Sequence, residues 1–148
     1  MKYTLIIPTY NEAPVIVQTL QTLIAKFHEN CSADIEIIVT DNASTDGTAK
    51  LVESMNDARV CVIRLTEKGK GRALRAGFRA AQGEIVGFTD VDLSVPSDEI
   101  ISAFTRVEKN PNTIIIGSRY HPESVMPGRE WWRIGSSRIF NILAKVIV

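Results

Sequence analysis

Two carboxylates, Asp90 and Asp92, stand one residue apart directly after the apolar run 84–89. The run is typical of a buried strand, so the acids begin where the strand ends. On an extended backbone, residues i and i+2 point to the same side, and open α/β sheets bind ligands at the carboxyl ends of their strands. Carboxylate oxygens suit Mg²⁺ or Mn²⁺, and a divalent ion offset by phosphate oxygens would relieve the repulsion between two such close acids. The pair therefore predicts a metal site made by Asp90 and Asp92.

The elements that would position this pair alternate along the chain, because short β-rich runs are separated by longer stretches with helical spacing. The expected strands cover residues 3–7, 35–40, 60–65, 85–89 and 113–117. Four helices are expected. The first runs from Pro14 to about Phe27, the second covers about 45–55, the third follows residues 69–71, and the fourth covers 97–109. This alternation predicts the α/β class, with a mostly parallel sheet and helices on both of its faces.

Two other strand ends carry side chains that suit a nucleoside. Tyr10 and Glu12 follow the first expected strand, where a ring can contact a base and an acid can accept hydrogen bonds from hydroxyls. Asp41 follows the second expected strand and can accept an imide or amino N–H of a base. The same residues also suit turns that cap the following helices, as does the pair Asp46-Gly47, so both interpretations stay open at this point.

Composition fits one soluble globular domain and narrows the function. The 148 residues are 45% hydrophobic, and 17 basic side chains balance 17 acidic ones, which argues against a general nucleic-acid binder. Residues 119–148 differ from the rest, because they hold five basic and two acidic side chains. We expect an α/β core over 1–118 and, in the same domain, a loop with a basic amphipathic helix over 119–148.

The two ends of the chain and its cysteines bear on location. Pro8 interrupts the apolar start, so we expect no secretory signal. Cys31 and Cys61 lie too far apart for a CxxC metal site, and we interpret both as reduced thiols of a cytoplasmic protein. The basic helical pattern from Trp131 onward suits either a membrane surface or packing on the sheet. It is too short to span a bilayer, and we expect the natural chain to continue beyond Val148.

These strand ends together resemble the inverting family-2 glycosyltransferases of the GT-A fold. The matching stretches are Ile6-Ile7-Pro8-Thr9-Tyr10-Asn11-Glu12, residues 38–48, Lys70-Gly71-Arg72-Ala73 and Asp90-Val91-Asp92-Leu93-Ser94. Within the family the chain is most similar to the polyprenyl-phosphate sugar synthases of the dolichyl-phosphate mannose and glucose type. That narrower likeness comes from the later stretches Gly117-Ser118-Arg119-Tyr120, Trp131-Trp132-Arg133, Ser137-Arg138 and Asn141.

The resemblance implies that the core over 1–118 binds the nucleotide sugar and that the loop and helix over 119–148 lie on the acceptor side. It also implies roles for individual residues. The nucleoside would be held by Pro8, Tyr10, Glu12 and Asp41. The ribose and the metal-bound diphosphate would be met by Asp90, Val91 and Asp92. The residues expected to act in catalysis are Asp92, Arg119 and Arg133. An arginine fork suits phosphate oxygens of the donor or of a lipid acceptor, although both arginines also suit a solvated surface.

Lys70 and Gly71 are candidates for a nucleotide contact, whereas the stripe of Arg72, Arg75 and Arg79 suits a solvated helix face. Two positions depart from the family's common pattern. Asn42 follows Asp41 where a second acid is common, and Val91 replaces a small residue between the two aspartates. We expect the valine side chain to narrow the donor pocket.

The leading hypothesis is a metal-dependent inverting hexosyltransferase that uses a UDP- or GDP-hexose, Mg²⁺ or Mn²⁺, and a dolichyl or undecaprenyl phosphate acceptor. It would lie peripherally on the cytosolic face of a membrane. One alternative is transfer to a saccharide hydroxyl in the synthesis of a cell-envelope polysaccharide or glycolipid. The alternative of another class is a non-catalytic nucleotide-sugar-binding or membrane scaffold protein. A nucleotidyltransferase fits less well, because no glycine-rich phosphate loop follows the first strand.

Overall fold

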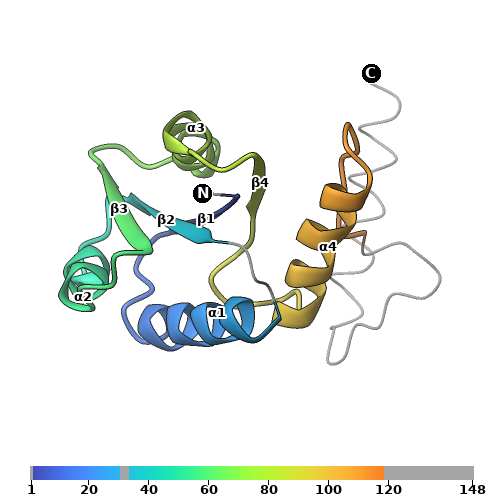
Figure 1. Cartoon of the computed structure of the whole chain (residues 1–148). Helices are drawn as coiled ribbons and strands as arrows, with labels where there is room; N and C mark the ends of the chain where they lie inside the picture. Colours follow the sequence, from blue (N-terminus) through green and yellow to red (C-terminus); the bar gives the residue numbers. More distant parts are fainter. Residues whose placement is uncertain (1, 31–33, 119–148) are drawn as a thin grey trace, which may run out of the picture. The chain divides into compact units, whose positions relative to one another are not determined.

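The computed structural model describes residues 2–30 and 34–118, and Met1–Ile115 form one compact unit (Figure 1). Eight elements follow one another in the order β1 (Tyr3–Thr9), α1 (Ile16–Asn30), β2 (Ile35–Asn42), α2 (Thr48–Ser54), β3 (Val60–Leu65), α3 (Lys70–Ala80), β4 (Ile85–Phe88) and α4 (Ser97–Lys109). The alternation of strands and helices that the sequence predicts is confirmed over this range.

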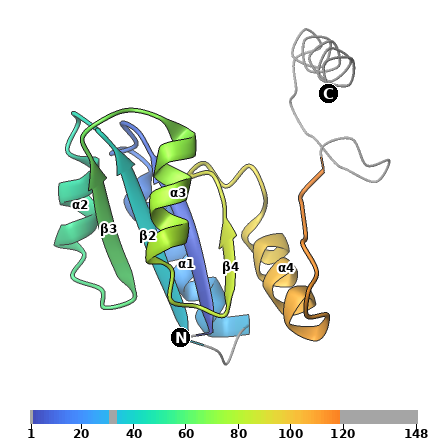
Figure 2. The same cartoon turned by 90° about the horizontal axis from the view of Figure 1, so that it is seen from above.

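The four strands form one sheet in the order β3-β2-β1-β4, and every neighbouring pair is parallel (Figure 2). Thr9 at the end of β1 lies opposite Asp41 near the end of β2, and Ile6 lies opposite Phe88. Because all strands run the same way, the loops that follow them meet at one edge of the sheet. The predicted parallel sheet therefore brings its carboxyl ends together as expected.

Helices cover both faces of this sheet, with α3 on one face and α1 and α2 on the other (Figure 1). The central strands β1 and β2 are buried along almost their whole length, which explains their near-continuous apolar sequences. On the α3 face Ile6 packs against Gly77. On the other face α1 presents apolar side chains at helical spacing, among them Ile16, Leu20 and Leu23.

An aromatic cluster joins α1, α4 and the start of β1. The rings of Tyr3 and Phe104 have centroids 5.1 Å apart, and those of Phe27 and Phe104 are 5.6 Å apart at 79°. All three side chains are almost fully buried. Edge-to-face packing of this kind adds about 0.5–1.5 kcal/mol per pair beyond area burial, so the cluster helps to fix α4 against α1.

The prediction of a fifth strand at 113–117 is wrong, because these residues have no regular secondary structure. Ile114 is 86% exposed and Ile116 is 79% exposed. A strand requires a neighbour for its backbone N–H and C=O groups, and no described strand pairs with this segment. The apolar run therefore carries the composition of a strand without the pairing.

The starts of two helices also differ from the sequence-based expectation. The first helix begins at Ile16 rather than at Pro14, because residues 13–15 form a turn. The second helix begins at Thr48 rather than near 45, because Gly47 adopts φ +89° directly before it.

Among the residues that the structure describes, no helix is both long enough and apolar enough to cross a bilayer.

Candidate active site

The loops after β1 and β2 are hydrogen-bonded to each other at the carboxyl edge of the sheet. The N–H of Asn11 donates to Ser44 Oγ over 2.9 Å, and the N–H of Thr45 donates back to Asn11 Oδ1 over 2.9 Å. Asn11 adopts φ +55°, a conformation that asparagine tolerates better than most residues. The reciprocal pair fixes the backbone on both sides of the site.

A second set of hydrogen bonds extends this link toward α2. The N–H of Glu12 donates to Thr48 Oγ1 over 2.9 Å, and the N–H of Ala13 donates to Asp46 Oδ2 over 2.9 Å. Asp46 Oδ1 accepts from the N–H and the hydroxyl of Thr48 at 3.0 and 2.5 Å. These bonds, that from the Thr48 hydroxyl first, lower the pKa of Asp46 below its usual value of 3.8. Asp46 therefore orders the turn before α2, as the capping interpretation of Asp46-Gly47 predicts.

Asp41 is the residue at this edge whose hydrogen bonding is least complete. Its side chain is only 4% exposed, and Oδ2 accepts from the N–H of Ser44 over 3.3 Å. Oδ1 is buried and has no hydrogen-bond partner among the described residues, which is also true of the hydroxyls of Thr9 and Thr40. A buried polar atom without a partner is costly. Asp41 is therefore suited to accept a hydrogen bond from a ligand.

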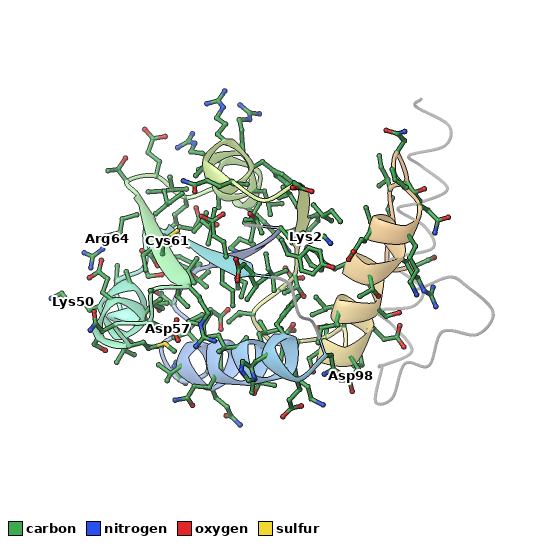
Figure 3. All side chains as sticks on the ribbon, in the orientation of Figure 1. Lys2, Lys50, Asp57, Cys61, Arg64 and Asp98 are labelled. Carbon is green, nitrogen blue, oxygen red and sulfur yellow. The ribbon has the colours of Figure 1, made fainter. Side chains whose placement is uncertain are left out.

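A cavity of about 280 Å³ opens beside Asp41. Its lining comes from the loop after β2, from α2 and from β3, and includes Ser44, Leu65 and Arg64. Figure 3 shows Lys50 on α2 and Arg64 on the neighbouring β3. A larger cavity of about 450 Å³ lies between α1 and the start of β3, and none of the predicted site residues lines it. The smaller cavity is thus the one that accompanies the candidate site.

The residues around the first loop lie as the sequence predicts, at the end of β1. Pro8 is within β1 opposite Thr40, and Tyr10 follows the strand with 38% of its surface exposed. Desolvation raises the pKa of Glu12, and the negative charges of Asp92 and Asp46 raise it further. The Glu12 and Asp92 carboxylates therefore act on each other electrostatically across the edge, which is a setting that favours a bound cation.

The acid pair itself lies beyond β4, in a turn. The expectation of an extended backbone from Asp90 to Asp92 is wrong, because the N–H of Leu93 donates to the carbonyl of Asp90 and Leu93 adopts φ +48°. Asp92 accepts from the N–H and the hydroxyl of Ser94 at 3.0 and 2.7 Å. The tightly turned backbone, rather than strand alternation, sets the direction of both carboxylates.

Val91, between the two acids, faces the interior instead of a donor pocket. Its side chain is 5% exposed and belongs to the hydrophobic core, and its carbonyl accepts from Thr19 Oγ1 over 2.8 Å. The side chain of Val91 is therefore out of reach of a donor, and its carbonyl is already bonded within the protein. The expected narrowing of the pocket by the valine side chain is wrong for this reason.

Lys68, in the loop after β3, and Lys70, the first residue of α3, contact two of these residues. The sequence makes Lys70 a candidate for a nucleotide contact but does not predict either of these contacts. Lys70 Nζ lies 2.5 Å from Asp90 Oδ1, and Lys68 Nζ lies 4.2 Å from the centroid of the Tyr10 ring. Between them the N–H of Gly69 donates to Asn42 Oδ1 over 2.7 Å. Asn42, which replaces a common second acid, thus has a role in anchoring this loop.

Arg119 and Arg133, the two arginines that are predicted to contact phosphate oxygens, lie outside the described residues. Within the described residues no group of three or more His, Cys, Asp or Glu side chains is arranged to hold a metal ion. Asp90 and Asp92 supply hard oxygen donors, and the ion pair of Asp90 with Lys70 places a cation at this carboxylate. The two residues fit Mg²⁺ or Mn²⁺ when a ligand contributes the remaining oxygens.

The chain is similar in sequence to two sugar transferases whose names include undecaprenyl phosphate and dolichol phosphate. It is 30% identical over 146 residues to an undecaprenyl-phosphate 4-deoxy-4-formamido-L-arabinose transferase of Proteus mirabilis, which covers 96% of this chain and 43% of that protein. It is 38% identical over 123 residues to a dolichol-phosphate mannosyltransferase of Pyrococcus furiosus, covering 81% of this chain and 34% of that protein. The chain spans less than half the length of these relatives.

Solved structures agree with the predicted GT-A fold. A mannosyltransferase of Pyrobaculum calidifontis in complex with GDP-Man and Mn²⁺ matches with a TM-score of 0.59 and 37% identity, over 72% of this chain and 32% of that chain. S. aureus TarS 1–349 in complex with UDP-GlcNAc matches with a TM-score of 0.62 and 25% identity, over 82% of this chain and 38% of that chain. The family model for glycosyl transferase family 2 matches residues 4–146, so the chain belongs to that family.

Proposed function

We propose that this protein transfers a hexose from a nucleotide-diphosphate sugar to a polyprenyl phosphate, dolichyl or undecaprenyl phosphate, with inversion at the sugar carbon. The observation that carries the donor half is the buried Oδ1 of Asp41, which has no partner among the described residues and belongs to a residue that lines a cavity. The acid pair follows β4 at the same edge of the sheet. The acceptor half is supported by the two relatives that act on undecaprenyl and dolichol phosphates.

The nucleoside would occupy the edge formed by β1 and β2. Asp41 Oδ1 would accept an N–H of the base, which would give this buried oxygen its missing partner. Tyr10 would contact the base with its exposed ring, and Glu12 would accept from ribose hydroxyls. Pro8 would complete the contacts, whereas Val91, which is buried with its carbonyl bonded to Thr19, would support the turn that carries the two acids. The nucleoside would bind to a backbone that the hydrogen bonds between the loops after β1 and β2 already hold in place.

The diphosphate would lie over the turn after β4. Asp90 and Asp92 would hold Mg²⁺ or Mn²⁺ together with phosphate oxygens, and the ion would supply charge neutralisation for the departing diphosphate. Arg119 and Arg133 would add fixed positive charge for the phosphates of the donor or the acceptor. The protein's main contribution would be to align donor and acceptor for displacement.

The reaction would be a single in-line displacement. An oxygen of the acceptor phosphate would form a bond to the anomeric carbon while the bond from that carbon to the donor's diphosphate oxygen breaks, and the nucleoside diphosphate would leave. A phosphate monoester is already anionic near pH 7, so the acceptor needs no general base. This acceptor places the reaction at a membrane surface, and we propose the cytosolic face.

The test is a panel of labelled UDP- and GDP-hexoses, each with Mg²⁺ or Mn²⁺ and with undecaprenyl or dolichyl phosphate. We expect label in the organic-soluble lipid, and its loss in the variant Asp92→Asn. The variant Asp34→Asn is the matched control, because Asp34 is an exposed aspartate before the amino end of β2. Label in a glycan would instead support transfer to a saccharide hydroxyl. Metal-dependent donor binding without turnover would support a non-catalytic role.

A further inference from the structure

Lys68 and Lys70 each contact a residue that the proposed function assigns to the donor. The ammonium of Lys68 donates to the hydroxyl of Tyr10 and also lies 4.2 Å from the centroid of the ring. One ammonium that makes both contacts lies toward the hydroxyl end of the ring. Part of the surface that a base would contact on Tyr10 is therefore taken by a side chain of the protein itself.

Lys70 makes the corresponding contact at the other half of the site. Its Nζ lies 2.5 Å from Asp90 Oδ1, and both side chains are about half exposed, at 59% and 43%. A metal ion held by Asp90 needs a lone pair of the same carboxylate. Lys70 and a divalent ion are therefore competitors for one group, since both seek a negative oxygen and repel each other at this distance.

The backbone between the two lysines explains how side chains only two positions apart reach both Tyr10 and Asp90. Gly69 adopts φ +154° and ψ +105°, a conformation that L side chains rarely adopt, and its N–H is bonded to Asn42 Oδ1 at 2.7 Å. The lysines thus flank a residue that is tied to the end of β2. Lys68 extends toward the end of β1, and Lys70 extends toward the turn after β4.

We propose that Lys68 and Lys70 form a cover over the donor site, in which Lys68 holds part of the place of the base and Lys70 holds the place of the metal ion. This inference rests on the proposed function. Donor binding would release both ammonium groups from Tyr10 and Asp90 while the Gly69–Asn42 anchor remains. The cover weakens the separate binding of a base or of a metal ion. Lys70 also neutralises the charge of Asp90 until the donor and the metal ion bind together.

The metal half is tested with Mn²⁺ alone, measured by calorimetry or by electron paramagnetic resonance on the whole chain. Exposed ion pairs are weak, so Lys70→Met is expected to bind Mn²⁺ about two- to fivefold more tightly than the natural protein. Lys109→Met, at the exposed end of α4, is the control and should leave the affinity unchanged. Equal or weaker Mn²⁺ binding by Lys70→Met would overturn the proposal.

The base half is tested with the free nucleosides uridine and guanosine, without metal. Lys68→Met keeps the length of the side chain and removes its charge, and it should bind the preferred nucleoside about two- to fivefold more tightly, as expected for loss of an exposed cation–π contact. Lys70→Met should leave nucleoside affinity unchanged. Weaker binding by Lys68→Met would mean that Lys68 supports the Tyr10 ring or contacts the base, and the cover would be refuted.

Failure of the cover and failure of the proposed function give different results. If Asp41→Asn and Asp90→Asn bind nucleoside and Mn²⁺ as the natural protein does, the site itself is misplaced and both proposals fall. If these two variants lose binding while the lysine variants gain none, the donor site stands and the cover alone is wrong.

Discussion

The main-chain N–H of Ala13 donates to Oδ2 of Asp46 over 2.9 Å, which joins two loops that are 33 residues apart in the sequence. The other oxygen of the same carboxylate accepts from Thr48. One side chain therefore holds the turn before α1 and the start of α2 together. The site depends on this link because Tyr10 and Glu12 lie in the first loop and Asp41 lies near the end of β2, directly before the second.

The variant Asp46→Asn should lower the stability of the fold in a pH-dependent way. The folded-state pKa of Asp46 lies below 3.8, so its carboxylate contributes stability that is present above about pH 3.8 and is lost as the pH falls through the folded-state value. The natural protein should therefore be the more stable of the two at pH 7, and the difference should shrink toward pH 3. Urea unfolding at several pH values measures this. A difference that does not change with pH would contradict the assigned role.

The variant Gly77→Ala should destabilise the fold by about 1–3 kcal/mol, because an added Cβ at this position overpacks the interface between α3 and β1. The Cβ would lie 2.5 Å from Cγ2 of Ile6, which is fully buried. Gly71→Ala in the same helix is the control, since a Cβ there meets nothing within 4 Å. That control should be neutral or stabilise by up to about 1 kcal/mol through helix propensity. Chemical denaturation of both variants would check the difference.

The variant Thr4→Val should cost about 1–3 kcal/mol through a buried hydrogen-bond network. The Thr4 hydroxyl donates to Glu36 Oε2 over 2.8 Å and accepts from the N–H of Gly83 over 2.8 Å. Valine has nearly the same shape but leaves both partners without this hydroxyl. Thr22→Val is the matched control, because the Thr22 hydroxyl makes its hydrogen bond at the exposed side of α1, to the carbonyl of Gln18 in the same helix. Equal unfolding midpoints for the two variants would show that the network does not contribute.

The variant Asp41→Asn should separate binding from stability. Loss of a hydrogen bond to a charged acceptor should weaken nucleoside diphosphate binding about tenfold or more. Stability should stay equal or rise, because the buried Oδ1 has no partner among the described residues and the substitution removes its charge. Calorimetric titration with UDP and GDP, beside thermal unfolding, measures both. Lower stability with unchanged affinity would mean that Asp41 is a structural residue and not a nucleoside contact.

Local sequence patterns were sufficient to predict the eight described elements and the parallel sheet, because period and length are local properties. They failed at 113–117, where the composition of a strand is present but pairing depends on a distant partner. They also failed for the direction of Asp90 and Asp92, which is set by the positive φ of Leu93 and the hydrogen bonds from Ser94. The contacts of Lys68 and Lys70 carry no local signal, since they arise only when three strand ends meet.

The outer side of β4 has a practical consequence. Within residues 2–30 and 34–118, this strand pairs with β1 alone, and Phe88 on it is 53% exposed beside the 47% exposed Phe78 of α3, the two rings packing edge to face. An unpaired strand edge next to exposed hydrophobic rings favours self-association. Concentrated samples of the protein should therefore self-associate through the edge of β4. A charged residue in place of Phe88 is the substitution expected to keep the protein monodisperse.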